Sequence, residues 1–250
     1  MKLKLMTYNI AAGRNYSNYS AEGETFIDPA SAIEFVKSES PDVCGFNEVD
    51  RLTHRSGGLD EPEMMREILG YNCVFGKAIP LAPVEIAEYG NAFTTRFPII
   101  ESEIIPIPLP KTPREGAHYE QRSVIRARVD VEGREVTFIQ THFGLSPEEH
   151  EECVELITAL IDKEGDTPVV FAGDLNVLPD NPVLDPIRAR LFDTGTLIDA
   201  PYKTYPTHTR ESRFLKIDYI FLSRHFKPIS ARVPRVNVSD HYPYIIEVEF

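Results

Sequence analysis

Ten short segments rich in β-branched and aromatic residues, against only four helical patterns, constrain the fold of this chain more than any other feature. The predicted strands are residues 2–9, 42–48, 72–77, 92–96, 123–131, 135–142, 168–174, 217–222, 229–233 and 244–249. The predicted helices are residues 29–38, 61–69, 147–163 and about 182–190. A regular barrel of alternating strands and helices needs one helix for each strand, so this ratio excludes it.

Local signals define several of these elements. The third helix has Ser146 as its N-cap and Pro147 in its first turn, and Glu149 completes a capping box. A short turn between the strands 123–131 and 135–142 predicts a hairpin. The economical arrangement is an α/β fold in which two mixed β-sheets pack face to face, with the helices outside.

Domain organisation is indicated by what the sequence lacks, since no internal repeat, low-complexity tract or composition break marks a linker. The densest proline run, IPIPLPKTP at residues 105–113, predicts an extended loop instead of a hinge. We therefore expect a single domain over residues 1–250 with no transmembrane segment. The first apolar run is too short for a signal sequence, so we expect a soluble, cytoplasmic protein.

Charge narrows the range of partners. The formal net charge of −13 does not favour a nucleic acid partner, because binding by global attraction needs a basic surface. Residues 203–235 differ, with eight Lys or Arg and two acidic residues, and form either an anion-facing surface or a solvated basic edge. Cys44, Cys73 and Cys153 lack CxxC spacing, which favours buried free thiols. Nothing in the sequence indicates the oligomeric state.

The stretch VVFAGDLNV, residues 169–177, ends a predicted strand with a carboxylate and a carboxamide two positions apart. Successive strand side chains alternate, so Asp174 and Asn176 share one face and Leu175 points to the other. The same residues could simply begin a turn. Polar residues recur at or beside the ends of other predicted strands: Asn9, Glu48, His142, Asp240 and His241.

Asp218 lies within an otherwise apolar predicted strand, where an unpaired buried carboxylate is costly, and His241 is a suitable partner for it. Each of these polar residues taken alone also fits a turn, a solvated strand end or a satisfied interior histidine. Their shared pattern instead predicts one polar cleft at an edge of the two sheets. Glu48 and a nearby Asp supply the hard oxygen ligands that Mg²⁺ or Mn²⁺ prefers, and amides and histidines can donate to phosphate oxygens.

Eight motifs in order carry a family resemblance: TYNIAAG, FNEVD, GNAFTTRFPI, EQRSVIRARV, THFG, GDLN, KIDYIF and SDHYP. With them, the chain resembles the endonuclease/exonuclease/phosphatase superfamily of metal-dependent phosphoesterases over essentially its whole length, and its layout is similar to that of the compact bacterial members. The resemblance implies a four-layer αββα sandwich with the active site at one edge of the paired sheets.

The resemblance also implies roles for the polar residues. The implied site for Mg²⁺ or Mn²⁺ has Glu48 as principal ligand, Asn9 beside it and Asp240 near the ion. In the implied catalytic group, Asp174 orients or deprotonates the attacking water. Asn176 and His142 hold the scissile phosphate. His241 stabilises the phosphoryl charge and is paired with Asp218. Such hydrolysis needs an in-line water and charge neutralisation on the nonbridging oxygens.

Substrate choice is less constrained. Arg122 matches the Glu-x-Arg start of a family strand, and Arg14 and His208 lie in loops (residues 11–27 and 204–214) that suit substrate binding or mere solvent exposure. We expect a metal-dependent hydrolase of small or headgroup phosphoesters, either diesters or monoesters. The alternatives are a DNA or RNA nuclease, which the acidic charge and the lack of Trp disfavour, and a catalytically silent binding module.

Overall fold

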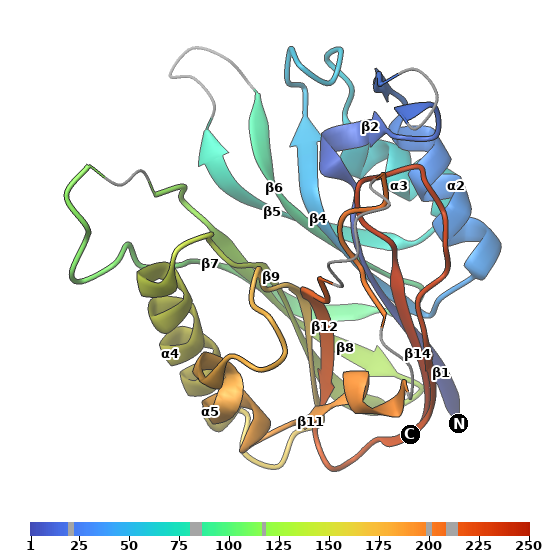
Figure 1. Ribbon diagram of the computed structural model, residues 1–250. Helices are drawn as coiled ribbons and strands as arrows, with labels where there is room; N and C mark the ends of the chain where they lie inside the picture. The colour runs from blue at the N-terminus through green and yellow to red at the C-terminus, as the bar shows by residue number, and fades with distance from the viewer. Residues whose placement is uncertain (20–22, 81–86, 117–118, 199–201, 209–214) are drawn as a thin grey trace.

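The computed structural model describes residues 1–19, 23–80, 87–116, 119–198, 202–208 and 215–250, and two six-stranded mixed sheets form its centre (Figure 1). The first sheet has, in spatial order, β13 (Lys227–Arg232), β14 (Tyr244–Glu249), β1 (Lys2–Asn9), β4 (Val43–Arg51), β6 (Glu88–Thr95) and β5 (Asn72–Pro80). The second has β11 (Phe192–Asp193), β12 (Asp218–Leu222), β10 (Val169–Asp174), β9 (Arg134–His142), β8 (Ser123–Val131) and β7 (Ile99–Pro106). A small ribbon joins β2 (Arg14–Asn15) to β3 (Phe26–Ile27).

Each sheet contains a parallel pair of strands near its middle. Strand β1 runs parallel to β4 with Asn9 opposite Asn47, and β10 runs parallel to β9 with Asp174 opposite His142. Parallel strands end at the same edge of a sheet, so both pairs deliver their last residues to one place. These two pairs position the site described below.

The helices lie on the outer faces of the two sheets, which confirms the α/β sandwich (Figure 1). Helices α2 (Pro29–Glu39) and α3 (Glu61–Leu69) cover the first sheet, and α4 (Pro147–Lys163) and α5 (Asp185–Arg188) cover the second. Short 3₁₀ turns form at η1 (Ala11–Gly13), η2 (Pro182–Leu184) and η3 (Thr194–Leu197). The predicted capping box of Ser146 and Glu149 is present at the start of α4.

Strand alternation divides the apolar residues into three layers. On β1, Leu3 and Leu5 pack between the sheets, whereas Met6 and Tyr8 pack under α2 and α3. On β10, Val170 faces the other sheet and Phe171 faces the helix side. Successive residues of each strand therefore pack on opposite sides of the sheet, as the alternation in the sequence predicts.

Several predicted boundaries change. Strand β7 is not among the predicted strands, and its exposed, glutamate-bearing pattern is typical of an edge strand, which needs little apolar alternation. The predicted helix 182–190 is instead η2 followed by the four-residue α5, with Pro186, which lacks an N–H donor, in its first turn. The strand predicted at residues 72–77 is longer and ends at Pro80, and the strand predicted at residues 92–96 begins earlier, at Glu88.

The three cysteines are free thiols, as expected, although Cys73 is only half-buried. Among the residues that the structure describes, no helix combines the length and apolar character needed to cross a bilayer. Residues 20–22 of the predicted substrate loop 11–27 and residues 209–214 of the predicted substrate loop 204–214 lie outside the described residues.

Candidate active site

The layer between the sheets changes from apolar to polar toward one edge. Along β1 the inward positions run from Leu3 and Leu5 to Asn9, and along β10 they run from Val170 to Asp174. Strand β9 repeats the change and ends at His142. All the inward polar residues on these strands are nearly or fully buried. The predicted polar edge is therefore the end of the same layer that forms the central core.

The GDLN segment combines a strand end with a turn. Strand β10 stops at Asp174, and the backbone N–H of Asn176 donates to Asp174 Oδ1 at 3.0 Å. Leu175 points the other way and is fully buried in the apolar layer beneath α4. Gly173 has φ +147°, and a Cβ there would lie 1.9 Å from the carbonyl oxygen of Thr141. Only glycine lets β10 approach β9 this closely. Because the strand ends at Asp174 and Asn176 has φ +51°, a turn and not strand alternation places Asn176.

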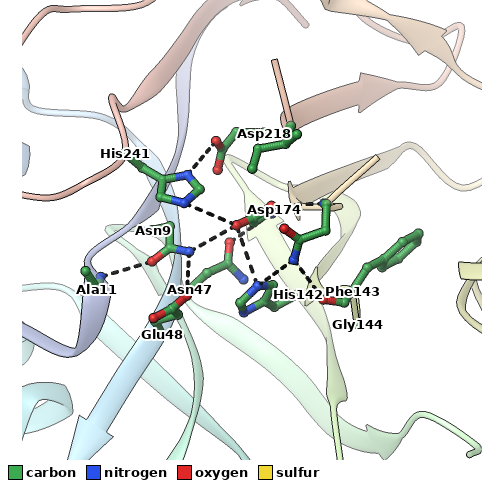
Figure 2. Close-up of polar contacts among 12 residues, drawn as sticks. Asn9, Ala11, Asn47, Glu48, His142, Phe143, Gly144, Asp174, Asp218 and His241 are labelled. Atoms are coloured by element: carbon green, nitrogen blue, oxygen red, sulfur yellow. Dashed lines mark hydrogen bonds and ion pairs between the residues drawn. The ribbon is translucent and has the colours of Figure 1, made fainter. Parts of the chain in front are cut away.

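Asn9 joins the two carboxylates of the site (Figure 2). Its Nδ2 donates to Glu48 Oε1 at 3.1 Å and to Asp174 Oδ2 at 3.0 Å, while its Oδ1 accepts from the backbone N–H of Ala11 at 3.0 Å. The backbone donor fixes the orientation of the carboxamide, because an N–H requires the oxygen on that side. Asn9 therefore links β4 of one sheet to β10 of the other.

Glu48 does not end its strand, contrary to the sequence prediction, because β4 continues to Arg51. The pairing of β4 with β6 is irregular between Phe46 and Val49, and Glu48 has φ +53° there. This bulge re-aims the side chain toward the site. Burial raises the pKa of Glu48, and the charge of Asp240 raises it further. A carboxylate held in this way gains from a nearby cation.

His241 and Asp218 form the pair that the sequence suggested, with Nδ1 of His241 2.9 Å from Asp218 Oδ2. Asp218 opens β12 opposite Asp174 and does not lie inside the strand. Burial alone would lower the pKa of His241, but the charges of Asp218 and Asp174 raise it to about 10. Nε2 of the ring lies 3.6 Å from Asp174 Oδ2. At neutral pH the site therefore contains an imidazolium beside Asp174.

His142, unlike His241, is held in its neutral form. Its Nδ1 lies 2.9 Å from Nη1 of Arg122, and its Nε2 lies 3.1 Å from Asn176 Nδ2 and 3.5 Å from Asp174 Oδ2. Burial, together with the charges of Arg122 and His241, lowers the pKa of His142 well below its usual value. A guanidinium offers only donors, so Nδ1 accepts and the ring hydrogen is on Nε2. Nε2–H then faces Asp174, and its 3.1 Å approach to Asn176 Nδ2 brings two N–H donors together.

The predicted substrate residues separate into two places. Arg122 lies inside the site and contacts Tyr89 Oη at 3.3 Å in addition to His142. Arg14 is exposed on β2, and the ring of His208 stacks on Tyr16 with 5.2 Å between the ring centroids. Burial raises the pKa of Tyr16, and the charge of Asp240 raises it further.

Two residues that sequence reasoning missed also belong to the site. The ring of Tyr205 lies 4.8 Å from the ring of His241, between centroids. Asn47 precedes Glu48 and contacts the backbone of Asp174. Asn47 is part of the FNEVD motif, but neither residue is the last of a predicted strand.

Two sets of donor atoms are candidates for a metal ion. Asp174, Asp218 and His241 have ligand atoms that all lie within 4.8 Å of one another. Within this set, Nδ1 of His241 already bonds Asp218 Oδ2 at 2.9 Å, so two of its members are paired with each other. Glu48 and Asp240, whose charge raises the pKa of Glu48, offer hard carboxylate oxygens, and only the Asn9 amide donates to Glu48 among the described side-chain contacts. That donor chemistry fits Mg²⁺ or Mn²⁺.

Comparison with solved structures finds the same fold in several proteins. An endonuclease/exonuclease/phosphatase from Beutenbergia cavernae is 24% identical with a TM-score of 0.80, over 100% of this chain and 72% of that chain. A mannosyl-6-phosphatase from Bacteroides thetaiotaomicron is 20% identical with a TM-score of 0.75, over 99% and 100%. TDP2 from D. rerio, complexed with a single-strand DNA product, is 16% identical with a TM-score of 0.70, over 100% and 99%.

A comparison with curated protein sequences finds no match. The model of the endonuclease/exonuclease/phosphatase family matches residues 6–241, which is nearly the whole chain and includes every polar residue of the site. The chain belongs to the endonuclease/exonuclease/phosphatase family.

Proposed function

We propose that this protein hydrolyses small or headgroup phosphoesters with the help of a divalent metal ion, by in-line attack of water. One observation carries the proposal: the Asn9 amide bridges two carboxylates, and an imidazolium lies 3.6 Å from the second of them. A phosphoester hydrolase needs a cation site, a water-orienting group and a charge-stabilising donor within reach of one phosphorus atom. Glu48, Asp174 and His241 supply these three functions.

The proposed metal group is Glu48 as principal ligand, with Asn9 beside it and Asp240 nearby. Glu48 is half-buried and its pKa is raised, so a cation relieves the cost of its charge. The family is generally divalent-metal dependent, and Mg²⁺ or Mn²⁺ suits an all-oxygen donor set. A divalent ion held there supplies charge neutralisation to the phosphoryl oxygens.

The proposed catalytic group is Asp174, Asn176, His142, His241 and Asp218. Asp174 accepts from the attacking water and is oriented by Asn9 Nδ2 and the backbone N–H of Asn176. His241 donates from Nε2 to the phosphoryl group, because Asp218 holds the opposite nitrogen. His142 Nε2 and Asn176 Nδ2 lie 3.1 Å apart and both offer N–H donors to the phosphate.

The proposed substrate-binding residues are Arg122, Arg14 and His208. Arg122 is almost fully buried and acts on the phosphate side through His142. Arg14 and His208 flank Tyr16 at the outer side of Glu48 and Asp240, where an organic group esterified to the phosphate would extend. An aromatic surface of this kind binds a sugar or another ring by its faces.

A nuclease remains the second candidate, because the D. rerio TDP2 structure holds a single-strand DNA product. The net charge of −13 supports the small-substrate proposal over this one. A silent binding module would not need an imidazolium paired to a buried aspartate next to a second carboxylate. The cytoplasmic location expected from the sequence stays a prediction.

The test is a substrate panel with purified protein in Mg²⁺ or Mn²⁺. It comprises p-nitrophenyl phosphate, bis-p-nitrophenyl phosphate, mannose 6-phosphate, single-stranded DNA, plasmid and sphingomyelin vesicles. We expect hydrolysis of one of the small or headgroup esters, loss of activity with EDTA, and loss in Glu48→Gln but not in the matched control Glu103→Gln on the exposed strand β7. Cleavage confined to DNA would favour the nuclease, and no hydrolysis with either metal would refute both enzyme proposals.

A further inference from the structure

Three buried carboxamides lie directly behind the candidate site. Asn47, Asn91 and Gln140 are at most 2% exposed. Asn47 Oδ1 accepts from the backbone N–H of Asp174 at 3.0 Å and from Gln140 Nε2 at 3.1 Å. Its Nδ2 donates to the carbonyl oxygen of Thr141 at 2.8 Å and to Asn91 Oδ1 at 2.9 Å. One side chain thus uses its full capacity of two donors and two acceptor sites.

The orientation of the Asn47 amide is unambiguous. A backbone N–H can only donate and a backbone carbonyl can only accept, so Asp174 and Thr141 determine which side carries the oxygen. Gln140 and Asn91 then have one consistent orientation each. Asn91 continues the chain of bonds to the carbonyl oxygen of Ser123 at 3.1 Å.

The bonds of Asn47 cross between the two sheets. Asn47 belongs to β4, whereas Thr141 belongs to β9 and Asp174 to β10. Asn47 directly precedes Glu48, as Figure 2 shows. Thr141 directly precedes His142. The Asn47 amide therefore ties the backbones that carry the proposed metal ligand, the proposed water-orienting carboxylate and the phosphate-holding histidine.

Strand β4 has two local features that make room for these carboxamides. A Cβ on Gly45 would lie 2.0 Å from Gln140 Oε1, so the glycine makes room for the Gln140 carboxamide. The irregular pairing of β4 begins after Phe46 and lets Asn47 point inward while the next residue, Glu48, also reaches the site. A regular strand would send these two neighbours to opposite faces.

We propose that Asn47 is a positioning residue for the reaction: it fixes the backbone of Asp174 relative to Glu48 across the gap between the sheets. This inference rests on the proposed function. A purely structural amide would only stabilise the fold, because buried polar groups need partners wherever they lie. A positioning amide must in addition set the turnover, since a shift of about 1 Å in a catalytic group can cost about a hundredfold in rate.

The experiment compares Asn47→Leu with Gln140→Met. Both remove a buried carboxamide at similar side-chain volume, but Gln140→Met leaves the bonds of Asn47 to Asp174 and Thr141 in place. We expect both variants to melt at lower temperature. Only Asn47→Leu should lower kcat, by about a hundredfold, with KM within about threefold of the wild-type value. Hydrogen exchange at the Asp174 amide should become faster in Asn47→Leu alone.

Two results would overturn the proposal: equal kcat losses in both variants, or an Asn47→Leu variant that melts lower yet keeps kcat within about threefold. If Asn47→Leu does not fold, Asn47→Gln keeps the carboxamide but displaces it by one methylene, and it should lose about tenfold in kcat. A wild-type protein without activity would refute the proposed function instead. Exchange at the Asp174 amide and Mn²⁺ affinity would then decide whether Asn47 holds the two halves of the site, and unchanged values would refute that.

Discussion

The two ends of the layer between the sheets are built from the same strands but differ in chemistry. At one end, Leu5 of β1 and Val170 of β10 pack in an apolar core. Four residues further along each strand, Asn9 and Asp174 face the same layer and form the candidate site. Burial of apolar side chains at the first end stabilises the folded state, whereas burial of charged side chains at the second end destabilises it through desolvation.

Stability and the proposed activity therefore have separate locations within one structural layer. The pKa of Asp174 is raised mainly by burial, with a contribution from Asp218, which means that its charged form is disfavoured in the folded protein. Only the nearby donors, including Asn9 and the His241 imidazolium, act in the opposite direction. The polar end is therefore expected to cost stability, and the apolar end is expected to supply it.

The largest expected effect is at the polar end. Asp174→Asn keeps the shape of the side chain but removes its charge and one acceptor, so we expect kcat to fall by about 100- to 1,000-fold. The free energy of unfolding at neutral pH should stay equal or increase, because the cost of the buried charge disappears. Steady-state kinetics and urea denaturation of the same preparation measure both quantities. A large loss of stability with little change in kcat would mean that Asp174 stabilises the fold and does not take part in catalysis.

The opposite result is expected from Leu5→Ala on β1. Leu5 is 2% exposed, and truncating such a residue costs about 2–5 kcal/mol in the free energy of unfolding. Turnover per folded molecule should not change, because Asn9 keeps its bonds at the other end of the strand. Kinetics well below the melting temperature, normalised to the folded fraction, provide the measurement. A fall in turnover comparable to that of Asp174→Asn would show that the two ends are coupled.

A smaller effect is expected in the pH dependence of Asp218→Asn. The folded pKa of His241 is raised to about 10, above its ordinary value of 6.5, so the imidazolium persists through neutral pH and is lost only as the pH rises past that value. Removing the Asp218 charge lowers this pKa, and the alkaline limb of kcat should move to lower pH. A profile from about pH 6 to about pH 10 tests the shift. An unmoved limb would mean that His241 is not the titrating donor.

The smallest expected effect concerns the outer aromatic group. Tyr16 is half-buried and stacks with His208, outside the layer between the sheets. Tyr16→Ala should raise KM for the best substrate of the panel by about three- to tenfold, the value of one aromatic contact, and leave kcat unchanged. The control is inorganic phosphate, whose inhibition constant should be the same in both proteins. Equal weakening of inorganic phosphate would place Tyr16 on the phosphate side instead.

Much of the fold could be predicted because its signals are local. Strands β1, β8 and β14 and helices α3 and α4 have the predicted bounds, since alternation and caps mark them within a few residues. Edge strand β7 could not be recognised, because its exposed pattern lacks alternation and its place depends on pairing with β8. The predicted helix 182–190 is interrupted before α5, because Pro186 has no N–H donor to continue a helix from the preceding turn.

The site was predictable where polar residues end regular strands. Asn9, His142 and Asp174 follow that rule, and they come together because two parallel pairs end at one edge. Glu48 and Asn47 do not follow it, since both reach the site through an irregularity that is defined by pairing with β6. Tyr205 was missed because its contact with His241 joins two loops that lie far apart in the sequence.

Calorimetric titration with Mn²⁺ tests most directly whether the polar end is a metal-dependent catalytic site. The wild-type protein and Leu5→Ala, which alters only the apolar end, should bind Mn²⁺ with the same affinity. Glu48→Gln should lose this binding, because it removes the charge of the proposed principal ligand. Mn²⁺ binding of equal strength in Glu48→Gln and the wild-type protein would contradict the account.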